Sequence, residues 1–153
     1  MIFTFYRKLG KPVAQLTAET KPNINTTISE DASIGLLTTF NLSIGCRVML
    51  RKNRWLNGKL VNRSVGTVRA IVYKKDVRPP DLPSYVLVEF DEYRGLGIHD
   101  YLFPIVPITK IFIHKGLKCF RKQLPLILGY AFTIYKAQGL TLEKVEKVEY
   151  IFS

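Results

Sequence analysis

The sequence predicts a mainly β fold with some α structure, organised around a small β-barrel or sandwich at about residues 51–118. Short runs rich in β-branched and aromatic residues recur at close spacing, and loops containing glycine and proline separate them. The composition, 47% hydrophobic and 12% aromatic, is that of a folded protein rather than a disordered one. A length of 153 residues suits one ordinary domain, or a small domain inserted into part of another.

The first third of the chain predicts two strands and a loop between them. Residues 13–16 alternate apolar and polar side chains, which indicates a strand entered through a turn. Residues 17–31 are polar and contain Pro22, so we expect a loop there. Residues 40–50 contain Leu42, Ile44, Val48 and Leu50 with Gly45 interrupting, which predicts a strand with a bend at that glycine.

The middle of the chain predicts the strands of the barrel. Residues 66–73 alternate strictly, and residues 85–90 form a strongly β-prone run. Residues 105–113 form a further β-rich run, flanked or interrupted by Pro104 and Pro107. Because proline cannot donate a hydrogen bond to a neighbouring strand, we expect this run at a sheet edge or a bulge.

The apolar run 124–139 is ambiguous between strand and helix, and it carries the first candidate binding site. It places hydroxyl, ammonium and amide donors beside a glycine that allows close approach of the backbone to a ligand. The alternative is an ordinary helix C-terminus, with lysine in the last turn and glycine after it. The candidate residues are Thr133, Lys136, Gln138, Gly139 and Thr141.

The charge distribution favours a polyanionic partner. The net charge is +11, and the segment 45–78 alone holds ten basic residues against one acid, a net charge of +9. Such a segment attracts phosphate backbones or other anionic surfaces. Taken alone, this charge is better explained by a solvated basic face or by contact with the acidic surface of a partner protein.

The two cysteines, Cys46 and Cys119, are far apart and outside any C-x-x-C pair, which predicts two buried thiols in a reducing compartment. His99 and His114 have no companion ligand at a useful spacing, so no metal site is expected. The apolar stretch 1–6 is too short for a signal sequence or membrane span, and we expect an intracellular protein with no membrane partner.

A second candidate site lies in the segments 44–53 and 60–68, which read I-G-C-R-V-M-L-R-K-N and L-V-N-R-S-V-G-T-V. Arg47, Arg51 and Lys52 are the residues there that are suited to contact phosphates. Surface solvation explains the cations nearly as well. Asn62 is expected to hydrogen-bond its own turn, and Gly66 to adopt a conformation closed to other residues.

These segments resemble the PIF-one-like (petite integration frequency) 5′-to-3′ DNA helicases of superfamily 1B. Relatives read G-A-R-V-M-L-x-x-N, then G-L-V-N-G-x-x-G-x-V, and finally R-x-Q-h-P-L-x-L-A-x-A-h-T-I-(H/N)-K-(S/A)-Q-G-x-T. This chain has the three motifs in that order, the last one at 121–141. The resemblance covers almost the whole chain.

The resemblance implies a fold and a partner. Family members have two RecA-like domains with ATP and Mg²⁺ bound between them, single-stranded DNA crossing both, and a Src-homology-3-like barrel inserted in the second. By this comparison, 1–50 and 119–153 are parts of an incomplete second RecA-like domain and 51–118 is the inserted barrel. The partners expected are single-stranded DNA and the missing N-terminal RecA-like domain, in the nucleus or, as an alternative, in mitochondria.

The resemblance places Thr133, Lys136, Gln138 and Gly139 at the motif V turn, which touches the DNA backbone and couples it to the nucleotide. It also implies a place for Arg47, Lys52 and Asn53 near the base of the barrel. It departs from the family at Tyr135, where relatives have His or Asn, and at Arg63, which replaces the first glycine of the N-G-x-x-G turn. The strand-like run 86–92 ends in Asp and Glu like a Walker B motif, but we assign it to the barrel.

No G-x-x-x-x-G-K-S/T phosphate loop occurs in the sequence, and no motif VI arginine is identified. We therefore expect a C-terminal fragment of a helicase that contributes DNA-contacting surface but is not an ATPase alone and needs no cofactor alone. Two alternatives stay open. The chain is a stand-alone basic β-barrel that binds RNA or protein, or it is a relic without function.

Overall fold

The computed structural model describes residues 10–22, 35–53, 60–93 and 101–129. These residues form strands, turns and loops, without a helix among them. Within this part of the chain the strands are β1 (Ala14–Thr17), β2 (Glu19–Lys21), β3 (Thr39–Leu42), β4 (Arg47–Leu50), β5 (Val65–Val72), β6 (Tyr85–Phe90), β7 (Leu102–Ile105), β8 (Ile108–His114), β9 (Leu117–Gln123) and β10 (Leu126–Leu128).

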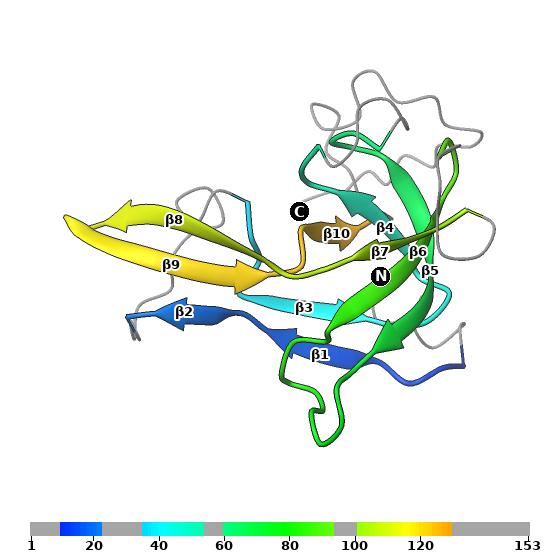
Figure 1. The fold of residues 1–153 in the computed structure, drawn as a ribbon, viewed down its shortest axis with the longest axis horizontal. Coiled ribbons are helices and arrows are strands. Elements are labelled where there is room, and N and C mark those ends of the chain that lie inside the picture. The colour runs from blue at the N-terminus through cyan, green and yellow to red at the C-terminus, as the bar shows by residue number, and fades with distance from the viewer. Residues whose placement is uncertain (1–9, 23–34, 54–59, 94–100, 130–153) are drawn as a thin grey trace, which may run out of the picture.

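The largest unit is a five-stranded antiparallel sheet in the order β10-β4-β5-β6-β7. Its centre is β5, which pairs with β4 through Val48 and Gly66 and with β6 through Val68 and Val88. The register between β5 and β6 shifts between Val68 and Ala70, a β-bulge that increases the local twist. The sheet curves at the right of Figure 1.

Two smaller sheets complete the described fold. Strands β1 and β3 form a two-stranded antiparallel sheet, and β2, β9 and β8 form a three-stranded antiparallel sheet in that order. The β8–β9 hairpin projects away from the five-stranded sheet, with β2 beneath β9 (Figure 1). The turn of this hairpin is Lys115-Gly116, both with positive φ.

One hydrophobic core joins the two-stranded and five-stranded sheets. It contains Leu16 of β1, Phe40 and Leu42 of β3, and the inward side chains of β4 to β7 and β10. The three-stranded sheet buries a separate and more polar face, with Phe112, Cys119, Arg121 and Gln123. Polar groups are therefore concentrated where this sheet meets the rest of the molecule.

The structure confirms several predicted strands and corrects others. The run 85–90 is β6, and 66–73 corresponds closely to β5. Gly45, at φ 89°, lies where the bend was predicted, but the predicted single strand 40–50 is divided there into β3 and β4, which belong to different sheets. The predicted loop 17–31 was wrong at its start, because Glu19–Lys21 forms β2 against β9.

The expected barrel is an open sheet in the described residues, with β10 and β7 as its edges. The predicted single strand 105–113 is divided between β7 and β8, which belong to different sheets. Pro107 lies between them and has no N–H to donate, so the chain leaves the five-stranded sheet there instead of closing it. Pro104 lies on the edge strand β7, as predicted.

Arg63, which stands where the resemblance expects a glycine, adopts the left-handed conformation. Its φ is 78°, and its N–H donates to the carbonyl of Leu50 at 2.8 Å. This non-glycine residue bears a conformational cost of about 1–2 kcal/mol.

We predict that Arg63→Gly raises the free energy of unfolding by about 0.5–1 kcal/mol, because relief of the left-handed strain exceeds the entropic cost of glycine. Urea unfolding followed by circular dichroism measures this change. Arg78→Gly is the control, since Arg78 is not among the positive-φ residues. Equal or lower stability of Arg63→Gly would show that the Arg63 side chain stabilises the turn by more than its strain costs.

Candidate nucleic-acid interface

Arg47 lies on β4 and is held by an acid across the sheet. Its guanidinium donates to Thr67 Oγ1 at 3.0 Å and to Asp91 Oδ1 at 2.8 Å, and a second nitrogen contacts Asp91 Oδ2. This bidentate pair joins β4 to the end of β6 and neutralises much of the Arg47 charge. Arg47 therefore has a structural role, as the partner of Asp91, beside its predicted role in binding.

Asn53 organises the turn that precedes β5. Its side-chain oxygen accepts a hydrogen bond from the backbone N–H of Asn62 at 2.6 Å. Ser64 Oγ accepts from the Val61 N–H at 3.0 Å. The turn expected to be fixed by the Asn62 side chain is thus fixed by Asn53 and Ser64, while the Lys52 side chain is exposed beside it.

The Walker-like run 86–92 belongs to the sheet, as predicted. Glu89 on β6 accepts from Arg69 Nε at 2.5 Å, across the β5–β6 pair, and Asp91 is the partner of Arg47. Both acids hold neighbouring strands together on the exposed side of the sheet. These contacts give them a structural role.

Exposed aromatic rings among basic residues can stack on bases, so the burial of Tyr73 and Tyr93 bears on a nucleic-acid interface. Tyr93 is fully buried and packs edge-on against Phe103, with ring centroids 5.5 Å apart. Tyr73 is partly buried against the core. Neither presents an open face to a base, and Trp55 lies outside the described residues.

Arg121, the first residue of the third motif, is buried at 2% exposure. Its guanidinium donates to the Leu36 carbonyl at 3.1 Å and to Thr20 Oγ1 at 3.3 Å, and it lies over the Phe112 ring at 5.8 Å. Burial lowers the pKa of this guanidinium. Arg121 therefore joins β2, β9 and the segment that leads into β3.

Lys110 on β8 was not singled out from the sequence. It lies directly across from Arg121 in the β8–β9 pair and shares the buried face of the three-stranded sheet. Burial lowers the pKa of Lys110, and the charges of Lys52 and Arg51 lower it further. The register of β8 against β9, which sequence patterns do not fix, brings these residues together.

The motif V candidates Thr133, Lys136, Gln138, Gly139 and Thr141 lie outside the described residues. The strand that precedes them in the sequence is described: β10 (Leu126–Leu128) pairs with β4. The Gly129 N–H then donates to the Arg47 carbonyl at 2.8 Å. The described part of the 121–141 segment therefore reaches β4, which carries Arg47 of the segment 44–53.

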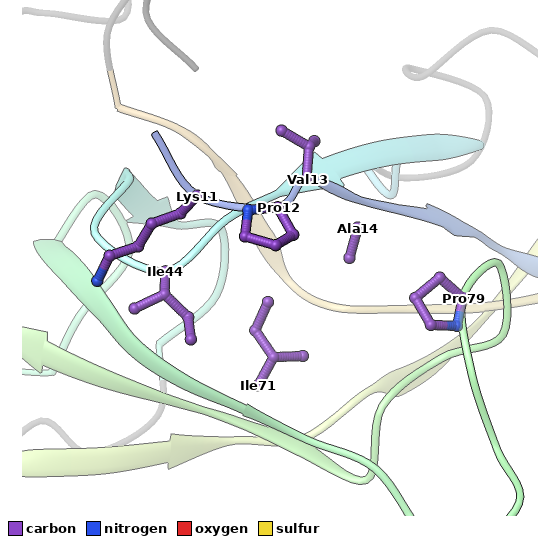
Figure 2. Close-up of a pocket in the computed structure, with 7 residues that line it drawn as sticks. All are labelled: Lys11, Pro12, Val13, Ala14, Ile44, Ile71 and Pro79. Carbon is purple, nitrogen blue, oxygen red and sulfur yellow. The ribbon is translucent and has the colours of Figure 1, made fainter. Parts of the chain in front are cut away.

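Other features of the described residues offer little catalytic chemistry. An apolar hollow of about 250 Å³ is lined by Lys11, Pro12, Val13, Ala14, Ile44, Ile71 and Pro79 (Figure 2).

Both cysteines are buried and free, and burial raises the pKa of Cys46 to about 11. No group of three potential metal ligands occurs in the part of the chain that is described. A helix long and apolar enough to cross a membrane is likewise not found there.

Sequence comparison finds helicases of one kind. The chain is 33% identical over 131 residues to the ATP-dependent DNA helicase PIF1 of Trypanosoma brucei brucei, which covers 66% of this chain and 13% of that protein. This chain is a relative of the Pif1 helicases. The rat PIF1 helicase is 28% identical over 134 residues, covering 84% of this chain and 18% of its own length. No family model matches the sequence.

The fold agrees with solved Pif1 structures. The Pif1 helicase of Candida albicans superimposes with a TM-score of 0.62 at 24% identity, covering 94% of this chain and 36% of that chain. A Bacteroides Pif1 helicase in complex with ADP-AlF3 and single-stranded DNA gives a TM-score of 0.59 at 24% identity, covering 94% and 30%. The chain therefore spans about a third or less of the Pif1 helicases that it matches.

Proposed function

We propose that this chain supplies single-stranded DNA contact and coupling surface to a Pif1-like, ATP-dependent 5′-to-3′ DNA helicase. The observation that carries the proposal is the pairing of β4 with β5 and β10, which brings described parts of the three Pif1-like segments side by side on a fold shared with Pif1 structures. The DNA-contacting residues proposed are Thr133, Lys136, Gln138, Gly139, Arg47, Lys52 and Asn53.

The arrangement of β4 supports a connection between the motifs. Its two neighbours are β5, which begins the predicted barrel strands, and β10, which leads into motif V. We infer that 51–118 corresponds to a Src-homology-3-like module inserted between 1–50 and 119–153 of a RecA-like domain. A displacement of the module would then reach motif V through the shared strand β4.

ATP hydrolysis is proposed to depend on other parts of a helicase. The sequence has no phosphate loop, which is the part that holds the nucleotide phosphates in such motors. No hydrolytic step is therefore assigned to the residues of this chain. A complementing RecA-like domain is the partner that this proposal requires.

We predict that Lys136→Ala weakens binding to a labelled (dT)15 oligonucleotide about three- to tenfold and flattens its salt dependence, because one phosphate contact is lost. Fluorescence anisotropy across a series of salt concentrations measures both quantities. Lys147→Ala is the matched control. This substitution removes the same charge as Lys136→Ala, but from the segment 143–149, in which acidic and basic residues are mixed.

The outcomes separate the proposal from its alternatives. Equal losses in the Lys136 and Lys147 variants would indicate a basic surface that meets any polyanion, as expected for a stand-alone basic module. Absence of binding by the folded wild-type chain would contradict the DNA-contact proposal altogether.

A further inference from the structure

The junction between the three-stranded and five-stranded sheets gathers cations from three separate segments. The segment Gly35–Leu37 runs through it. A Cβ added at Gly35 would lie 2.5 Å from the Arg51 guanidinium, so that side chain packs directly against the Gly35 backbone. One residue further on, the Leu36 carbonyl accepts from Arg121 at 3.1 Å.

Two further contacts fix the same junction. The Arg51 N–H donates to the Pro125 carbonyl at 2.8 Å, which holds Arg51 beside the end of β9. Gln123 Nε2 donates to the Leu37 carbonyl at 3.3 Å. Lys110 lies opposite Arg121 in the β8–β9 pair, so β8 also runs past this junction. Arg51, Arg121 and Lys110, which come from different strands or loops, thus lie near one another, and Lys52 directly follows Arg51 in the chain.

These cations are arranged from the core to the surface. Arg121 is buried, Arg51 and Lys110 are half-buried, and Lys52 is exposed. The pKa of Lys110 is lowered by burial first and by the charges of Lys52 and Arg51 second. Like charges held this close repel one another, and an anion bound among them relieves the repulsion.

Three acids of the described residues hold cations outside this junction. Glu19 pairs with Lys122 on the opposite face of the three-stranded sheet, while Glu89 and Asp91 pair with Arg69 and Arg47 on the five-stranded sheet. The Arg121 guanidinium donates to the neutral oxygens of Leu36 and Thr20. A phosphate has the charge and the acceptor oxygens that this group of cations would bind.

We propose that Arg51, Lys52 and Lys110 form a phosphate-binding cluster that contacts the backbone of single-stranded DNA. The inference rests on the proposed function and adds a contact on β8 that the sequence motifs do not include. Arg121 is a positioning residue, because it holds the Gly35–Leu37 segment against which Arg51 packs. The cluster extends the DNA-contacting surface from β4 onto the three-stranded sheet.

Lys110→Gln tests the cluster with two readouts. Removal of the charge is expected to weaken (dT)15 binding about three- to tenfold and to lower the salt slope by about 0.7, the value for one phosphate on a single strand. The melting temperature of the free protein should stay close to that of wild type, because glutamine keeps most of the unbranched side chain of the half-buried Lys110. A residue with a purely structural role would instead lower the melting temperature.

Lys75→Gln is the control, since Lys75 is an exposed lysine on the β5–β6 connection. It should leave the salt slope within about 0.2 of wild type. If Lys110→Gln fails to fold, Lys52→Gln gives the same test at an exposed side chain. Inorganic phosphate at equal ionic strength serves as a competitor that distinguishes a site for any phosphate from one that requires a nucleic-acid backbone.

The result that overturns the cluster is distinct from failure of the proposed function. If wild type binds (dT)15 and Lys136→Ala weakens it, but Lys110→Gln and Lys52→Gln bind like wild type, the cluster is wrong and the function stands. If folded wild type does not bind (dT)15, the proposed function fails and the cluster fails with it. A lower melting temperature with unchanged binding would assign Lys110 to the fold alone.

Discussion

Gly66→Ala is expected to lower the free energy of unfolding by about 3 kcal/mol, the upper part of the range for overpacking a close-packed site. A Cβ at Gly66 would lie 2.5 Å from the Glu89 carbonyl oxygen and 2.8 Å from Val88 Cγ1. The obstructing carbonyl is backbone of β6, so β5 and β6 must separate to admit a single methyl group. At roughly 2–4 °C per kcal/mol, the melting temperature should fall by about 6–12 °C.

Gly116→Asn is the control for this substitution. Gly116 has positive φ at the β8–β9 turn and open space around it, and asparagine tolerates that conformation. We expect a change of about 1 kcal/mol or less, measured by the same thermal or urea unfolding. A Gly66→Ala protein as stable as wild type would mean that β5 and β6 do not approach as closely as described.

Arg121→Ala is expected to lower the free energy of unfolding by about 2–4 kcal/mol. It removes the donors to the Leu36 carbonyl and to Thr20 Oγ1, and it removes the side chain packed over Phe112. A buried acceptor left without its donor costs about 1–3 kcal/mol. Release of a desolvated charge offsets part of the loss.

Two further variants separate these contributions. Arg121→Met retains an unbranched apolar chain without charge or donors, so comparison with Arg121→Ala isolates packing from hydrogen bonding. Lys122→Ala is the exposed neighbour, whose pair with Glu19 contributes about 0–1 kcal/mol. Equal stability of the Arg121→Ala and Lys122→Ala proteins in urea unfolding would contradict the anchoring role of Arg121.

Sequence patterns predicted the elements whose side chains alternate about one buried face. The alternation predicted at 85–90 and 66–73 is found in β6 and β5. Alternate side chains of these strands point into the core, and those between them point to the other face of the sheet. Gly45 was identified correctly as a bend, since its positive φ is a local requirement. Gly66 was singled out for the wrong reason. Its φ is outside the left-handed range, and it is required because β6 approaches its backbone closely.

The features that were not predicted depend on long-range pairing. Strand β2 is polar and contains no apolar alternation, so its place is decided by β9, about a hundred residues away. Lys110 gave no signal because a lysine in a β-rich run has no distinctive pattern. Only the pairing of β8 with β9, together with the Gly35–Leu37 segment, brings it close to Arg51 and Lys52.

The most direct test of the central claim is titration of the isotopically labelled 17.5 kDa chain with (dT)15, followed by amide chemical shifts. We predict that shift changes concentrate at Lys52, Lys110 and the motif V residues 133–139. The exposed β5–β6 connection at 74–76, which is also basic, should change little. Shift changes confined to 74–76 or spread evenly over all lysines would contradict a defined DNA-contacting surface in this Pif1 relative.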